Sequence, residues 1–209
     1  MRQGERAQGL LDIVYSNLMG PEDMTSVGGA KHILNFVDDL SGMTWTYLIK
    51  EKSQAEKVFI EWCALVENET SQKTKVFHTD SGGEFTSRQF KSHLHQQGIQ
   101  HQLMAPYTSS QNGHVGCTHR TIMDRARSIH SDLRLPVNLW GECMLTLTYM
   151  KNHTLLRSLK GKTPFEAYYG KKPNLSHLQE IGCHAFVLKQ GLNPKIYNWS
   201  IEYILIGYS

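Results

Sequence analysis

The sequence has 209 residues, of which 40% are hydrophobic and 20% are charged, as expected for a globular protein with a sizeable core. The formal net charge of +3 is too small to indicate a nucleic-acid partner by itself. No apolar run approaches the roughly 20 residues of a membrane-spanning helix, and the polar N-terminus lacks the apolar segment of a signal peptide, so we expect a soluble intracellular protein.

Three strands are predicted within the first fifty residues. Residues 10–17 form a short apolar segment that runs towards a Gly-Pro turn at residues 20–21. Residues 32–38 (HILNFVD) and 44–50 (TWTYLIK) are rich in aromatic and β-branched residues, and a turn at residues 39–42 separates them. This pattern predicts an antiparallel hairpin or meander.

Two helices are predicted to follow. We expect the first to begin at a capping box formed by Ser53 and Glu56. A second capping box, Thr86 with Gln89, is expected to open a helix that ends at Gly98. The first helix has one apolar stripe at helical spacing, made by Ala55, Val58, Phe59, Trp62, Leu65 and Val66.

Two more strands, at residues 74–80 and 99–104, are predicted on either side of the second helix. Residues 106–113 (PYTSSQNG) are predicted to form a polar loop, because turn-forming residues dominate them. We expect helices at residues 114–131 and 136–152 after this loop.

The C-terminal part predicts a short helix and two strands. Thr163, Pro164 and Glu166 suit the N-cap, first and third positions of a helix. Residues 184–189 and 203–207 are predicted strands.

The order of these elements is three strands, a helix, a strand, a helix, a strand and then helices. It predicts an α/β fold, a mixed five-stranded sheet flanked by helices, which is the layout of the ribonuclease H-like superfamily among others. We place this domain at residues 1–155. Residues 156–209 are expected to form a C-terminal extension, with a short helix and the beginning of a small β element.

Several short motifs between residues 78 and 121 carry the functional information. HTDSGGEFTS begins at residue 78, GIQHQLMAPYTSSQNG begins at residue 98, and a helix containing HRT follows. The stretch resembles copia-type retrotransposon integrases, which have an Asp-X-Gly-Gly-Glu-Phe turn, a Gly-Ile-X-His strand, a Pro-Tyr-Thr loop and a Gln-Asn-Gly helix start. Residues 36–53, 135–142 and 163–187 are also similar to this family, so the resemblance covers nearly the whole chain.

The resemblance implies DNA integration by phosphoryl transfer, with Mg²⁺ or Mn²⁺ ions held by three carboxylates on separate elements. Asp80 matches the second carboxylate. The third is expected after 35 intervening residues, where Gly116 stands, and the first corresponds to Asn17 in YSNLMGP. An amide and a glycine therefore replace two of the three acidic ligands.

Other acids offer limited compensation. Glu84 is the best candidate for a replacement ligand beside Asp80, whereas Asp38 or Asp39 is a weaker candidate. We expect at most one weakly bound ion and negligible strand transfer. Two alternatives stay open: an active transferase that uses Asp80 with unusual partners, and a non-enzymatic DNA- or protein-binding domain.

The resemblance also implies a nuclear, homo-oligomeric protein that binds the retroelement ends and target DNA. A solvated helix face is the alternative interpretation of the basic residues, and Tyr107 could simply pack beside Pro106. The residues expected to contact DNA are Tyr107, Gln111, Asn112, His119, Arg120, Arg125 and Arg127.

The cysteines and histidines predict no zinc site. The four cysteines form no CxxC pair, and the eleven histidines form no HxxxH or HExxH pair. Integrases of this type usually carry a zinc module before the core and β structure after it, so we expect a fragment of a longer polyprotein.

Overall fold

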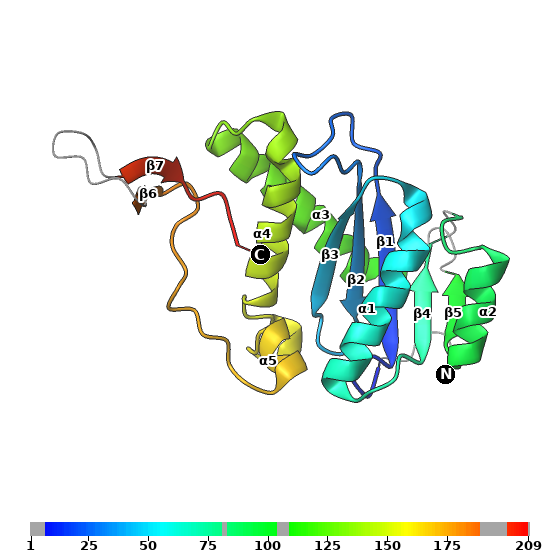
Figure 1. The fold of residues 1–209 in the computed structure, drawn as a ribbon. Helices are drawn as coiled ribbons and strands as arrows, with labels where there is room; N and C mark the ends of the chain where they lie inside the picture. The colour runs from blue at the N-terminus through cyan, green and yellow to red at the C-terminus, as the bar shows by residue number, and fades with distance from the viewer. Residues whose placement is uncertain (1–6, 81–82, 104–108, 189–199, 209) are drawn as a thin grey trace.

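The computed structural model describes residues 7–80, 83–103, 109–188 and 200–208, and of residues 109–120 it describes the backbone path alone. A five-stranded sheet in the order β3-β2-β1-β4-β5 forms the centre of this described part (Figure 1). The β1–β2 and β2–β3 pairs are antiparallel, whereas the β1–β4 and β4–β5 pairs are parallel. The predicted mixed sheet is therefore confirmed. Its strands are β1 (Ile13–Met19), β2 (His32–Asp38), β3 (Thr44–Ile49), β4 (Val76–Thr79) and β5 (Gln100–Leu103).

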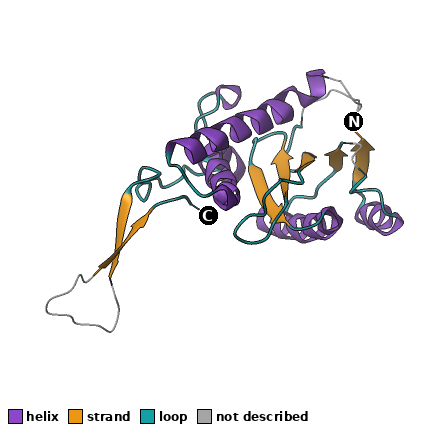
Figure 2. Ribbon diagram, turned by 90° about the horizontal axis from the view of Figure 1, so that it is seen from above, coloured by secondary structure: helices purple, strands orange, loops and turns teal. Residues whose placement is uncertain are grey.

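Helices cover both faces of the sheet (Figure 2). The α1 and α2 helices lie on one face, and α3 and α4 lie on the other. The helices are α1 (Ala55–Thr70), α2 (Arg88–Gln97), α3 (Ser109–Asp132), α4 (Trp140–Asn152) and α5 (Pro164–Tyr169), with short 3₁₀ turns η1 (Lys52–Gln54), η2 (Val137–Leu139) and η3 (Arg157–Leu159). None of those helices, within the described residues, is both long and apolar enough to span a bilayer.

Two apolar cores form because alternate residues of a strand point to opposite faces. On the α1 side, Phe36 stacks on Trp62 with ring centroids 4.6 Å apart, and both side chains are fully buried. On the α3 and α4 side, Ile33 packs against Ile122 and Met144. The β2 strand is buried along its whole length, since helices cover both of its faces.

The start of α1 differs from the prediction. A reciprocal capping pair of Glu51 and Gln54 opens η1, and α1 continues from Ala55. Glu56, which was expected to close a local box with Ser53, has a different set of partners.

The Glu56 carboxylate accepts hydrogen bonds from the backbone N–H (3.1 Å) and the hydroxyl (2.7 Å) of Ser87. Ser87 also caps α2 by accepting from the backbone N–H of Phe90, so the predicted cap at Thr86 is wrong by one residue. The starts of α1 and α2 are thus tied together, and two long-range donors replace the local capping box. Gly98 ends α2 in a left-handed conformation, as predicted.

The α3 helix begins at Ser109, five residues before the predicted start at residue 114. Part of the predicted loop is therefore helical. A single glycine inside a helix costs only about 1 kcal/mol relative to alanine. Packing of the apolar face of α3 against α4 can offset that cost.

The C-terminal residues form an antiparallel hairpin of β6 (His184–Leu188) and β7 (Ser200–Ile204), which projects from the body of the molecule (Figures 1 and 2). The α5 helix starts as predicted, with the Thr163 hydroxyl accepting from the backbone N–H of Glu166. Tyr168 of α5 belongs to the main core and packs edge-on against Trp45.

Candidate active site

Asn17, in the second half of β1, and Asp80, directly after β4, lie at corresponding positions of neighbouring parallel strands. The β1–β4 register pairs Tyr15 with His78, and two further residues along each strand bring Asn17 level with Asp80. Adjacent strands are about 4.8 Å apart, so the two positions are neighbours at one edge of the sheet. The structure therefore brings together two of the three positions that the sequence singled out.

The side chains just before these positions show which face is involved. The rings of Tyr15 and His78 stack with centroids 4.9 Å apart. Residues two apart on a strand share a face, so Asn17 points to the same side of the sheet as Tyr15. This is the side that α3 and α4 cover.

Glu84 lies close to Asp80. Burial raises the pKa of the Glu84 carboxyl, and the charge of Asp80 adds to this rise, together with a hydrogen bond that protonated Glu84 can make to it. Lys52 opposes the rise as a nearby cation. One oxygen of Glu84, Oε2, is buried without a hydrogen-bond partner. The two carboxyl groups thus form a pair of like charges beside the end of β4.

A row of neutral polar residues extends from Asn17 across the sheet. Asn17 pairs with Asn35 on β2, and Asn35 pairs with Thr46 on β3. The Thr46 hydroxyl donates to Oδ1 of Asn35 over 2.5 Å and lies 2.6 Å from the hydroxyl of Thr148 on α4. The sheet neighbour of Asn17 on this side is therefore a buried amide with no charge.

Asp38 and Asp39 do not approach this edge. Asp38 pairs with Val14, near the beginning of β1, and its carboxylate accepts from Ser41 and from the backbone N–H of Leu11. Asp39 accepts from the backbone N–H of Ala7 over 2.9 Å. The weaker candidates for compensation are thus wrong, because both carboxylates hold the chain at the opposite end of β1.

Gly116 lies about two turns into α3, in the part of the helix where the backbone path alone is described. The later turns of α3 pack on the face that carries Asn17, through Ile122 and Ala126 against Ile33. The helix with the third position therefore crosses the correct face of the sheet. A glycine at that position supplies no metal ligand.

These donors do not fit a two-ion centre. Two divalent ions need several anionic oxygens to replace their lost hydration. Near this edge the described residues provide the carboxylates of Asp80 and Glu84 and the neutral amide of Asn17. Nowhere in the described ranges do three or more His, Cys, Asp or Glu side chains converge on a possible metal position.

The basic residues of α3 fall into two groups. Arg125 and Arg127 are exposed, and Arg127 pairs with Asp124 over 3.1 Å. The side chains of Gln111, Asn112, His119 and Arg120 lie outside the described part, and so does the whole of Tyr107.

Comparison with known proteins agrees with this geometry. Residues 11–109 match the family described as Integrase core domain. The chain is 38% identical over 205 residues to the retrovirus-related Pol polyprotein from transposon TNT 1-94 of Nicotiana tabacum, a match that covers 98% of this chain and 15% of that protein. It is 28% identical over 200 residues to the corresponding polyprotein from transposon RE2 of Arabidopsis thaliana, with 95% of this chain and 14% of that protein covered. The chain thus spans about a seventh of the length of these relatives.

Solved structures show the same fold. The HTLV-2 integrase catalytic core domain, determined in complex with magnesium in a trimeric form, superposes with a TM-score of 0.58 at 18% identity, over 78% of this chain and 99% of that one. A chain of the simian T-cell lymphotropic virus intasome in complex with the PP2A regulatory subunit B56 gamma gives a TM-score of 0.61 at 18% identity, over 97% and 72% of the two chains. The mixed sheet with its two helical layers is the fold of an integrase catalytic core. Residues 11–109 thus match the integrase core domain, and nearly the whole chain is similar to a segment of the retrotransposon Pol polyproteins.

Sequence reasoning missed the neutral row behind Asn17 and the cation near Glu84. Asn35 interrupts an otherwise apolar strand, and such an interruption can indicate a polar contact across the sheet. Thr148 and Lys52 carried no comparable signal, since their roles depend on long-range packing.

Proposed function

We propose that this chain is the integrase-core region of a copia-type retrotransposon polyprotein that binds DNA but is impaired in metal-dependent strand transfer. Impaired strand transfer is supported by the set of possible metal ligands. A neutral Asn17 lies beside Asp80, the buried amide of Asn35 lies on the other side of Asn17, and Gly116 lies on the crossing helix. Too few anionic oxygens are present to hold two Mg²⁺ or Mn²⁺ ions.

The DNA-binding part of the proposal is supported by the exposed arginines of α3. Arg125 and Arg127 lie on the helix that crosses the Asn17 face, where a phosphate backbone passing the strand edge would meet them. By family, the DNA would comprise retroelement ends and target DNA, the protein would form homo-oligomers, and it would act in the nucleus. We further propose that residues 1–155 and 156–209 are its core domain and C-terminal extension.

A strand-transfer assay tests the catalytic part. Oligonucleotide duplexes with Mg²⁺ or Mn²⁺ would be incubated with the native chain and with the single variant Asp80→Ala. The double variant Asn17→Asp, Gly116→Glu would be tested in the same way, with and without Asp80→Ala. We expect product from the double variant alone. Product from the native chain that disappears on Asp80→Ala would instead support the alternative in which Asp80 and Glu84 sustain an active one-ion site.

Salt-dependent retention of duplex DNA tests the binding part. Arg125→Gln and Arg127→Gln should each reduce the slope of log affinity against log salt by about 1. A complete lack of retention at low salt would favour the other alternative, a domesticated or remnant domain with a non-enzymatic role in protein binding.

A further inference from the structure

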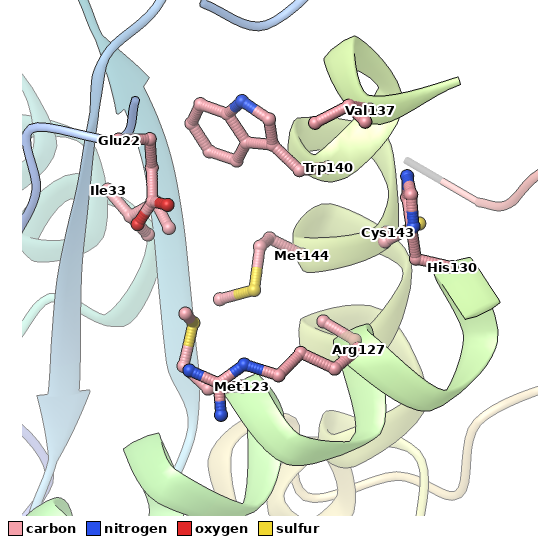
Figure 3. Close-up of a pocket in the computed structure, with 10 residues that line it drawn as sticks. Glu22, Ile33, Met123, Arg127, His130, Val137, Trp140, Cys143 and Met144 are labelled. Carbon is pink, nitrogen blue, oxygen red and sulfur yellow. The ribbon is translucent and has the colours of Figure 1, made fainter. Parts of the chain in front are cut away.

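A cavity of about 280 Å³ lies on the α3 and α4 side of the sheet (Figure 3). It opens between β2, the two long helices and the loop that joins β1 to β2. Its apolar lining includes Ile33 on β2, Met123 and Ala126 on α3, and Met144 on α4, with Trp140 forming one wall. This volume is just below the usual range of about 300–1,000 Å³ for small-molecule sites, so it suits one ring system rather than an extended chain.

The walls of the cavity are held in place by two long-range hydrogen bonds. The Trp140 indole N–H donates to the carbonyl of Met24 over 2.8 Å, and the backbone N–H of Val27 donates to the carbonyl of Asn138 over 2.9 Å. The β1–β2 loop is therefore fastened to the start of α4. A ligand would enter a site that is already formed.

Two opposite charges face into this apolar space without pairing with each other. The Glu22 carboxylate enters from the β1–β2 loop, and the Arg127 guanidinium enters from α3 (Figure 3). Arg127 contacts Asp124 through Nη1, which leaves donors of its five N–H groups for a ligand. Glu22 makes no ion pair within the part of the chain that the structure describes.

The charge pattern distinguishes between possible occupants. A purely apolar group would fill the space but leave the half-buried Glu22 carboxylate without a partner, which is unfavourable. A nucleobase has a flat apolar face for Met123, Met144 and Trp140, and it carries donors and acceptors at its edge.

Guanine offers a matching group to each of the two charges. Its N1–H and N2–H₂ groups are adjacent donors that a carboxylate can accept, and its O6 and N7 atoms are the usual acceptors for an arginine. Thymine offers a single ring N–H as a donor. We propose that this cavity binds one unstacked guanine, with Glu22 reading its Watson–Crick edge and Arg127 its O6 and N7 edge. This inference rests on the proposed function, because the guanine would come from the DNA that the chain is proposed to bind.

Nucleosides test the inference without the confounding charge of a phosphate. Binding of deoxyguanosine and of thymidine to the 209-residue chain would be measured by ligand-observed NMR and calorimetry. We expect deoxyguanosine to bind about tenfold or more tightly than thymidine. Glu22→Gln and Arg127→Gln should each weaken deoxyguanosine binding by about 5- to 150-fold, the range for loss of a bidentate contact to a base.

Matched controls are available for each charge. Asp23→Asn and Arg134→Gln remove the same charges from exposed residues that do not line the cavity, and they should leave deoxyguanosine affinity unchanged. Equal losses in the cavity and control variants would overturn the proposal. So would thymidine or free indole binding as tightly as deoxyguanosine, which would indicate an apolar site for a protein side chain.

Duplex retention, measured on the same samples, separates this inference from the proposed function. Retention of duplex DNA without deoxyguanosine binding overturns the guanine site alone. Deoxyguanosine binding without duplex retention overturns the proposed DNA-binding function and leaves the cavity assignment standing.

Discussion

Asn17 stands directly across the antiparallel β1–β2 ladder from Asn35, so two neutral amides are neighbours where the family resemblance predicts a metal-binding carboxylate. Asn35 is itself fixed, because the Thr46 hydroxyl donates to its Oδ1 atom and Thr148 adjoins Thr46. On the other side of β1, the register leads to Asp80. The edge is therefore neutral on one side and acidic on the other.

The first prediction concerns a carboxylate restored at this edge. Asn17→Asp places a second negative charge about 4.8 Å from the Asp80 strand position, and like charges on neighbouring strands repel. Without divalent ions we expect the variant to lose about 1 kcal/mol, which lowers Tm by about 2–4 °C for a chain of this size. Added Mg²⁺ should reverse the loss. A thermal scan with and without Mg²⁺ measures both effects, and Asn17→Ala is the control that should not respond to the ion.

The second prediction follows from the raised pKa of Glu84. Burial, followed by the negative charge of Asp80, favours the protonated form of Glu84 in the folded state. The contribution of Glu84 to the free energy of unfolding is therefore fully present below the ordinary glutamate pKa near 4.5, and it is lost as pH rises through the higher pKa of the folded state. Glu84→Gln should therefore stabilise the chain at pH 7, by about 1 kcal/mol, and make little difference at pH 4. Denaturant unfolding at both pH values tests this, and a loss of stability at pH 7 would contradict it.

The third prediction concerns Lys151 on α4. Burial lowers the pKa of its ammonium group to about 8, although the group donates to the carbonyl of Gly42 and the hydroxyl of Thr44. Between about pH 8 and the ordinary lysine value of 10.5 the unfolded chain binds the extra proton, so Lys151 makes stability rise with pH in that window.

Replacement by Lys151→Met should remove this rise, which we expect to reach about 1–2 kcal/mol. Unfolding free energies of the native chain and the variant at pH 7.5 and pH 10 give the comparison. Lys172→Met, at an exposed lysine, is the matched control. Identical slopes in all three chains would mean that Lys151 is solvated in the folded state.

The fourth prediction concerns the bond between α4 and the edge strand. The buried Asn152 side chain accepts from the backbone N–H of Thr44 over 3.0 Å and donates to its carbonyl over 2.7 Å, as a neighbouring strand would. Asn152→Ala leaves both backbone groups without these partners. It should cost about 2–4 kcal/mol of unfolding free energy. Chemical denaturation measures this cost, and a change below about 0.5 kcal/mol would show that water replaces the amide.

The sheet could be predicted from the sequence because each strand has a clear local pattern. Residues 32–38 and 44–50 are dense in β-branched and aromatic residues, and the strands lie at His32–Asp38 and Thr44–Ile49. The family motifs added the order of the elements. They also gave the positions of Asn17 and Asp80, which the register then brought level.

Local rules failed where long-range contacts competed with them. Glu56 was expected to cap its own helix, but it bonds Ser87 at the start of another helix. The pairing of Asn35 with Thr46, and the gathering of Glu22 and Arg127 around one cavity, depend on segments that are far apart in the chain. No periodicity within a short window could have indicated them.

Titration with Mn²⁺ measures the metal capacity of the strand edge most directly. Calorimetry or electron paramagnetic resonance would give the number of ions bound by the native chain and by the Asn17→Asp, Gly116→Glu variant. We predict at most one ion for the native chain, with an affinity about tenfold or more below that of the variant, which should hold two. Two ions bound equally well by both chains would contradict the claim that residues 17 and 116 have removed the metal centre.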